Sequence, residues 1–202
     1  MSDLMTVSRT WVRDHYGKSA EHLLKAEEWL RRINPDASQA MLLATLTHDM
    51  ERAFPEPDSP KPDPSLGPDD PIYNYAHSDR SARIVRDFLR TQHASEDLIA
   101  EVSRLIRAHE FGGWSNANWV QAADSLSFLE VNIDFFLDHI NPAEPKGWTV
   151  EWVRAKFDWM YNRIQIPAAH TLATPLHTTA IEKLQKKEDE LKQAREKASE
   201  HK

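Results

Sequence analysis

Apolar residues recur at intervals of three and four over most of this chain, and glycine occurs at only five of 202 positions. Such spacing gives a helix one apolar face, whereas a half-buried strand needs strict alternation of apolar and polar residues. No segment reads convincingly as a strand. The sequence therefore predicts an all-α fold, built as a single helical bundle. The expected helices cover about 4–15, 19–33, 37–50, 79–92, 95–109, 116–140 (with a possible break), 149–163 and 176–198.

Length and composition narrow the class of protein. A chain of 202 residues with 40% hydrophobic content is long enough for one domain with a substantial core. The net charge of −7 offers no basic field for nucleic acid or for an anionic membrane, so we expect a small-molecule partner. The absence of cysteine removes disulfides, thiolate nucleophiles and sulfur-based metal sites. Neither a signal-peptide pattern nor a membrane-spanning apolar run is present, and we expect a cytoplasmic protein.

Two segments stand apart from the helical pattern. Residues 54–71 contain seven of the twelve prolines and are predicted to form a loop, either a plain connector or a lid beside a functional site. Residues 176–202 are dense in charge and carry a thin apolar stripe. We expect a helical domain over 1–175 followed by a charged, solvated C-terminal helix or tail. A short coiled-coil contact, and hence a homodimer, is the alternative for that helix.

Several histidines and aspartates occupy positions where a helix should present apolar side chains to the core. The apolar run TLTHDMER, residues 45–52, ends in an adjacent His–Asp pair, and the helix at 79–92 is expected to begin just after His77, with Ser78 as its cap. A single inward histidine is usually a hydrogen-bonded core residue. Several such side chains are hard to satisfy with a separate hydrogen bond for each, whereas one or two cations would bind them all. The candidate metal ligands are His22, His48, Asp49, His77, His109 and Asp124.

The order of these residues resembles that of the HD-domain superfamily of metal-dependent phosphohydrolases, an all-helical family named for its His–Asp pair. The segments EHLLKAEEWL, MLLATLTHDMER and VQAADSLSFLE carry the likeness, which spans about residues 15–165. The resemblance implies one metal held by His22, His48, Asp49 and Asp124. The remaining ligands, His77 and His109, match the histidines of binuclear members, in which the aspartate of the pair bridges two metals. We therefore expect two divalent ions, with a single ion as the alternative.

Imidazole and carboxylate ligands without sulfur suit Mn, Fe, Co, Ni, Zn or Mg, and the sequence does not choose between them. Many family members follow the His–Asp pair with Ile-Gly-Lys, in which the lysine contacts substrate phosphate, whereas this chain has Met-Glu-Arg at 50–52. Arg52 has a planar fork suited to phosphate oxygens, although a plain surface cation is an equal alternative. Arg80 is a second candidate for phosphate binding. Glu51 and Glu110 are weaker candidates for moving a proton.

The resemblance favours a phosphohydrolase acting on a nucleotide or another small phosphate ester, with Asp49 and Arg52 as catalytic residues. Two alternatives come from other classes. A few HD-domain proteins use the same six ligands to hold a mixed-valent di-iron pair and act as oxygenases. The chain could also be a non-catalytic helical module that binds a structural or sensory metal.

Overall fold

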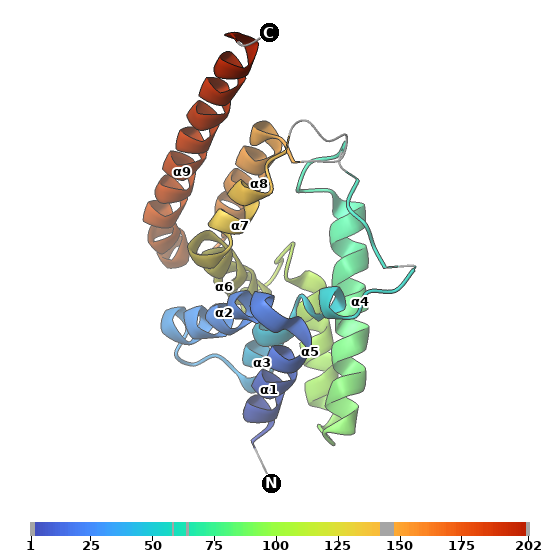
Figure 1. Ribbon diagram of the computed structural model, residues 1–202. Coiled ribbons are helices and arrows are strands. Elements are labelled where there is room, and N and C mark those ends of the chain that lie inside the picture. Colours follow the sequence, from blue (N-terminus) through green and yellow to red (C-terminus); the bar gives the residue numbers. More distant parts are fainter. Residues whose placement is uncertain (1–2, 58, 64, 142–147, 201–202) are drawn as a thin grey trace.

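The structure, a computed structural model, describes residues 3–57, 59–63, 65–141 and 148–200 (Figure 1). Within these ranges no named strand occurs, and an isolated bridge pairs Ile140 with Trp148. The prediction of an all-α fold is confirmed. The α-helices are α1 (Leu4–Tyr16), α2 (Ala20–Ile33), α3 (Gln39–Thr47), α4 (Pro71–Thr91), α5 (Glu96–Ala108), α6 (Ser115–Val131), α7 (Ile133–Asp138), α8 (Val150–Asn162) and α9 (Pro167–Glu200), and the short 3-10 helices are η1 (Gly17–Ser19) and η2 (Met50–Ala53).

Helices α3 and α6 form the centre of the bundle. Helix α2 packs on both of them, α4 lies along α5, and α6 also contacts α8 and α9 (Figure 1). Every residue of α3 from Ala40 to Thr47 is buried, which is typical of a helix enclosed on all sides. Because α3 runs through the core, the residues that follow its last turn, including His48, also lie in the interior.

The start of α4 differs from the sequence prediction. We expected a helix from about residue 79 with Ser78 as its cap, and this was wrong. The helix begins at Pro71, where the Asp70 side chain accepts a hydrogen bond from the Ile72 backbone N–H at 2.9 Å. Proline suits this position because the first helical N–H has no partner within the helix. His77 is therefore fixed inside a helix, rather than placed in the segment before one.

The proline-rich segment forms a loop, as predicted, in the residues that the structure describes. It runs from the end of η2 to Asp70, with positions 58 and 64 outside the description. The indole Nε1 of Trp152 in α8 donates a hydrogen bond to the carbonyl of Leu66 in this loop at 3.2 Å. This contact ties the loop to the opposite side of the bundle.

Helix α9 begins earlier than predicted, at Pro167 rather than near 176, and continues through Pro175. Ala173, Ala180 and Leu184 are buried against the bundle, and the later turns extend beyond α8 (Figure 1). The boundary expected at 175/176 falls inside this continuous helix, and the division into a domain and a tail stays a prediction. In the described part of the chain, no helix combines the length and apolar character needed to cross a membrane.

Candidate metal centre

The six histidines and aspartates singled out in the sequence meet inside the bundle. They come from five separate segments: α2, the residues that follow α3, α4, the residue that ends α5, and α6. None exposes more than 7% of its surface. The structure thus brings together His22, His48, Asp49, His77, His109 and Asp124.

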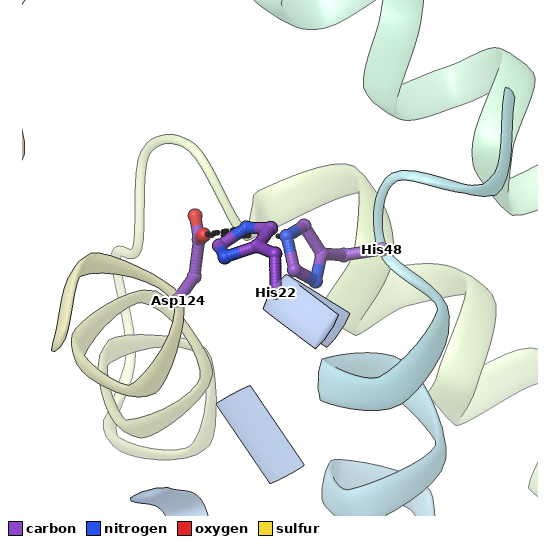
Figure 2. Close-up of side chains that lie close together, drawn as sticks. All are labelled: His22, His48 and Asp124. Carbon is purple, nitrogen blue, oxygen red and sulfur yellow. Dashed lines mark ion pairs between the residues drawn. The ribbon is translucent and has the colours of Figure 1, made fainter. Parts of the chain in front are cut away.

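His22, His48 and Asp124 form the first half of the cluster (Figure 2). Nε2 of His22 lies 3.1 Å from Oδ1 of Asp124, and Nε2 of His48 lies 3.2 Å from the same oxygen. Two ligands that each lie about 2.1 Å from one metal ion, at right or tetrahedral angles, are roughly 3.0–3.4 Å apart. The spacing of this half therefore matches the edges of a metal-coordination polyhedron.

Hydrogen bonds on the outer side of both rings fix which nitrogen faces the cluster. Ser127 donates its hydroxyl hydrogen to the His22 carbonyl at 2.7 Å, so its oxygen must accept from Nδ1 of His22 at 2.9 Å. Nδ1 of His48 donates to the carbonyl of Thr45 at 2.8 Å. In the neutral rings, Nε2 then carries the lone pair that a metal binds. Two such lone pairs and a carboxylate oxygen converge on one point, which requires a cation or a proton between them.

The second half contains Asp49, His77, His109 and Glu110. From the sequence, Glu110 was a weaker candidate for proton transfer and was not a predicted metal ligand. Oδ1 of Asp49 lies 3.6 Å from Nδ1 of His77 and 3.9 Å from Nε2 of His109. Nε2 of His77 donates to Oε1 of Glu110 at 3.0 Å, and Nδ1 of His109 donates to the Ile106 carbonyl at 2.7 Å. The inward nitrogens of both rings, with Nε2 of His48, are buried without a hydrogen-bond partner. Acceptors left unpaired in this way are what a metal site presents before its ion is bound.

The charges of the cluster depend on one another. Burial by itself would lower the pKa of His48, but the carboxylates of Asp124 and Asp49 outweigh it and raise the pKa to about 9. Burial would also raise the pKa of Asp124, but His48 and Arg163 hold it well below its usual range. In the same way, Arg163 and His109 keep the pKa of Glu110 low against its burial. At neutral pH the carboxylates are therefore ionised, and a metal ion that binds here would displace the proton that the raised pKa gives His48.

Arg163, which ends α8, was not singled out from the sequence. Its Nη1 donates to Oε2 of Glu110 and its Nη2 to Oδ2 of Asp124, while Nε donates to the Ser125 hydroxyl at 2.9 Å. Only 5% of its side chain is exposed. An arginine just beyond an amphipathic helix usually interacts with the last carbonyl groups of that helix. No local pattern reveals its true partners, because both lie far away in the sequence.

A cavity of about 950 Å³ opens onto the cluster. Its floor includes His22, Asp49, Glu110 and Asp124. Aromatic side chains line the walls, and part of the proline-rich loop closes one side. The aromatic residues are Tyr16, Tyr73, Phe128, Phe135, Phe136, Trp148 and Trp152.

The two arginines expected near substrate have different surroundings. Arg52 lines the cavity, with its side chain 44% exposed and Nε 3.4 Å from Oδ2 of Asp49. Arg80 is not among the lining residues. Its guanidinium donates to the carbonyls of Glu51 (3.0 Å) and Phe54 (2.7 Å) and pairs with the Glu51 carboxylate at 3.2 Å. Arg80 therefore holds η2 and the start of the proline-rich loop in place.

Lys156, which no sequence pattern indicated, also lines the cavity. The ammonium group of Lys156 lies 4.4 Å from the centre of the Trp159 ring and 5.4 Å from that of Phe128. No hydrogen bond or ion pair to this group is found in the described part of the chain. Burial lowers the pKa of Lys156 to about 8, although the carboxylate of Glu110 opposes the shift. The cavity thus has a cation in an apolar setting that is free to bind an anion.

No family model, curated protein or solved structure matches the chain. Three overlapping groups of ligand atoms, each within 4.8 Å of one another, can hold a metal ion: His22–His48–Asp124, His48–Asp49–His109 and His77–His109–Glu110. Imidazole and carboxylate groups of this kind bind divalent transition metals or magnesium.

Proposed function

We propose that the chain is a metal-dependent phosphohydrolase of the HD-domain type that acts on a nucleotide or another small phosphate ester. One observation carries the proposal: the buried groups that could hold a metal ion reach the floor of an open cavity through His22, Asp49, Glu110 and Asp124, and Arg52 and Lys156 line the same cavity. Candidate metal ligands and cationic side chains that face one cavity suit a substrate with concentrated negative charge.

The ligand groups divide naturally into two sites. His22, His48 and Asp124 would hold one ion, His77 and His109 a second, and Asp49 would contact both. Glu110, beside His77 and His109, adds a carboxylate to the second site. Divalent ions bound there would supply Lewis-acid chemistry and lower the pKa of a water molecule, so that hydroxide is available at neutral pH.

The protein's own contribution is to bind and orient the substrate. Arg52, beside Asp49, would bind phosphoryl oxygens closest to the metals, and its planar fork suits two of them. Lys156 would bind a further oxygen, because its ammonium group has no other hydrogen-bond acceptor among the described residues. A volume of about 950 Å³ admits a substrate of nucleotide size, and the aromatic walls provide apolar contact for the part of the ester beyond the phosphate.

The test is to determine the metal content of the purified protein and then assay a panel of nucleotides and sugar phosphates with each candidate metal. Phosphate release that depends on Mn or Co supports the hydrolase. A di-iron electron paramagnetic resonance signal without phosphatase activity would replace it with the oxygenase. Bound metal with neither property would identify a non-catalytic metal-binding module.

A further inference from the structure

Arg163 connects the two halves of the cluster, because it donates hydrogen bonds to a carboxylate in each half. Asp124 turns Oδ1 toward His22 and His48, and its other oxygen accepts from Arg163. In Glu110, Oε1 accepts a hydrogen bond from Nε2 of His77 and lies 3.6 Å from Nε2 of His109, while Oε2 accepts from Arg163. One guanidinium thus occupies the outer oxygen of one carboxylate in each half.

The guanidinium itself is firmly held. Nε donates to the Ser125 hydroxyl at 2.9 Å, and the Trp159 ring lies 4.5 Å from the central carbon. The backbone carbonyl of Glu110 accepts from the Gln121 amide at 3.0 Å, which fixes the turn that carries this carboxylate. Because the donors of a guanidinium lie in one rigid plane, the contacts of Arg163 set the orientation of both carboxylates.

We propose that Arg163 is a positioning residue for the metal centre. By binding the outer oxygens of Asp124 and Glu110, Arg163 leaves each carboxylate one inner oxygen for the metal ions. The inference rests on the proposed metal site. Without Arg163, either carboxylate could rotate and present both of its oxygens, and two buried negative charges would lose their counter-ion. Hydrogen-bond partners behind metal ligands typically contribute 10- to 100-fold to metal affinity.

Three variants separate the geometry of the fork from its charge. Arg163→Met removes both, whereas Arg163→Lys keeps the charge but provides a point donor that cannot span two carboxylates. Ser125→Ala leaves the guanidinium in place and removes only its Nε anchor. Arg154→Met is the matched control, since Arg154 lies on the same helix and pairs with Glu188 at the surface.

The measurement is calorimetric titration of metal-free protein with Mn²⁺, at a temperature well below the melting point of each variant. We expect affinity to fall about 10- to 100-fold in Arg163→Met, to stay low in Arg163→Lys, and to fall several-fold in Ser125→Ala, with no change in Arg154→Met. If Arg163→Met does not fold, Arg163→Lys and Ser125→Ala carry the test.

If Arg163 had a purely structural role, its substitution would lower the melting temperature without changing the affinity for Mn²⁺. That result would overturn the inference. Wild-type affinity in Arg163→Lys also overturns it, because charge alone would then suffice. In both cases the proposed function stands, since the wild-type protein binds metal. A wild-type protein that does not bind Mn²⁺ or any of the other candidate metals would remove the proposed function and the inference together.

Discussion

Oδ1 of Asp49 lies 3.6 Å from Nδ1 of His77, although one residue follows α3 and the other lies within α4. The same oxygen is 3.9 Å from Nε2 of His109, and Asp49 also groups with His48 of the first half. Asp49 is therefore the carboxylate through which the two halves of the cluster meet. This position raises the question of whether the cluster binds one metal ion or two.

We predict that the double variant His77→Gln/His109→Gln binds one equivalent of metal where the wild-type protein binds two. The first half keeps His22, His48 and Asp124, which with Asp49 suffice for one ion, whereas the second half loses both imidazoles. Phosphatase activity should fall with the second equivalent, because charge stabilisation by two metals is lost. Elemental analysis under saturating metal makes the count. A wild-type protein that saturates at one equivalent would contradict the binuclear site.

The two arginines expected near substrate should respond differently to removal. Arg52→Ala is predicted to lower kcat/KM by roughly 10- to 150-fold, the loss of one hydrogen bond to a charged group, with unchanged metal content. Arg80→Ala should instead lower the melting temperature, because the backbone carbonyls of Glu51 and Phe54 lose their donor. Steady-state kinetics and thermal unfolding of both variants make the comparison. Unchanged kinetics in Arg52→Ala would show that Arg52 is a surface cation that does not contact substrate.

Substrate affinity is predicted to weaken as the pH rises through about 8, where the ammonium group of Lys156 loses its proton. Lys156→Arg should bind substrate equally well at pH 7 and pH 9, because a guanidinium stays charged over this range. KM measured across this range tests the difference between the two proteins. Identical pH profiles for the wild type and Lys156→Arg would remove Lys156 from the substrate site.

The same lysine has a consequence for stability. Its folded-state pKa of about 8 lies below the ordinary value of 10.5, so the unfolded chain binds more protons between these limits. The contribution of Lys156 to the free energy of unfolding therefore increases with pH in that window. Lys156→Met should remove this increase. Urea unfolding of both proteins at pH 7.5 and 10 would show it, and parallel pH dependence in the two would refute it.

The helical pattern of the sequence accounts for the interior positions of the cluster. His22, His109 and Asp124 share helical faces with apolar residues, so their burial follows from periodicity alone. The start of α4 was missed because Asp70 and Pro71, a cap and a first-turn proline, lie at the end of a proline-rich segment that reads as loop. The start of α9 was placed too late because Pro175 lies inside the helix, where proline usually ends one.

The cations around the site were less predictable than its ligands. Arg163 and Lys156 lie on or at the end of α8, far in sequence from the carboxylates and the cavity floor that they approach. Their roles depend on how α8 packs against α6, which is a tertiary relationship without a local signature. Arg80 shows the converse, since it was a sequence candidate for phosphate binding, whereas in the structure its guanidinium binds η2.

The proposal that the buried histidines and aspartates bind metal is tested by the metal content of Asp49→Ala. The wild-type protein, saturated with metal and freed of excess by gel filtration, should retain about two equivalents by elemental analysis. Asp49→Ala should retain little or none, because Asp49 contacts both halves, while its helical circular dichroism stays native. Asp158→Ala, which breaks a peripheral pair with His177, is the control and should keep the wild-type content. Equal metal content in the wild type and Asp49→Ala would rule out a metal centre that includes Asp49.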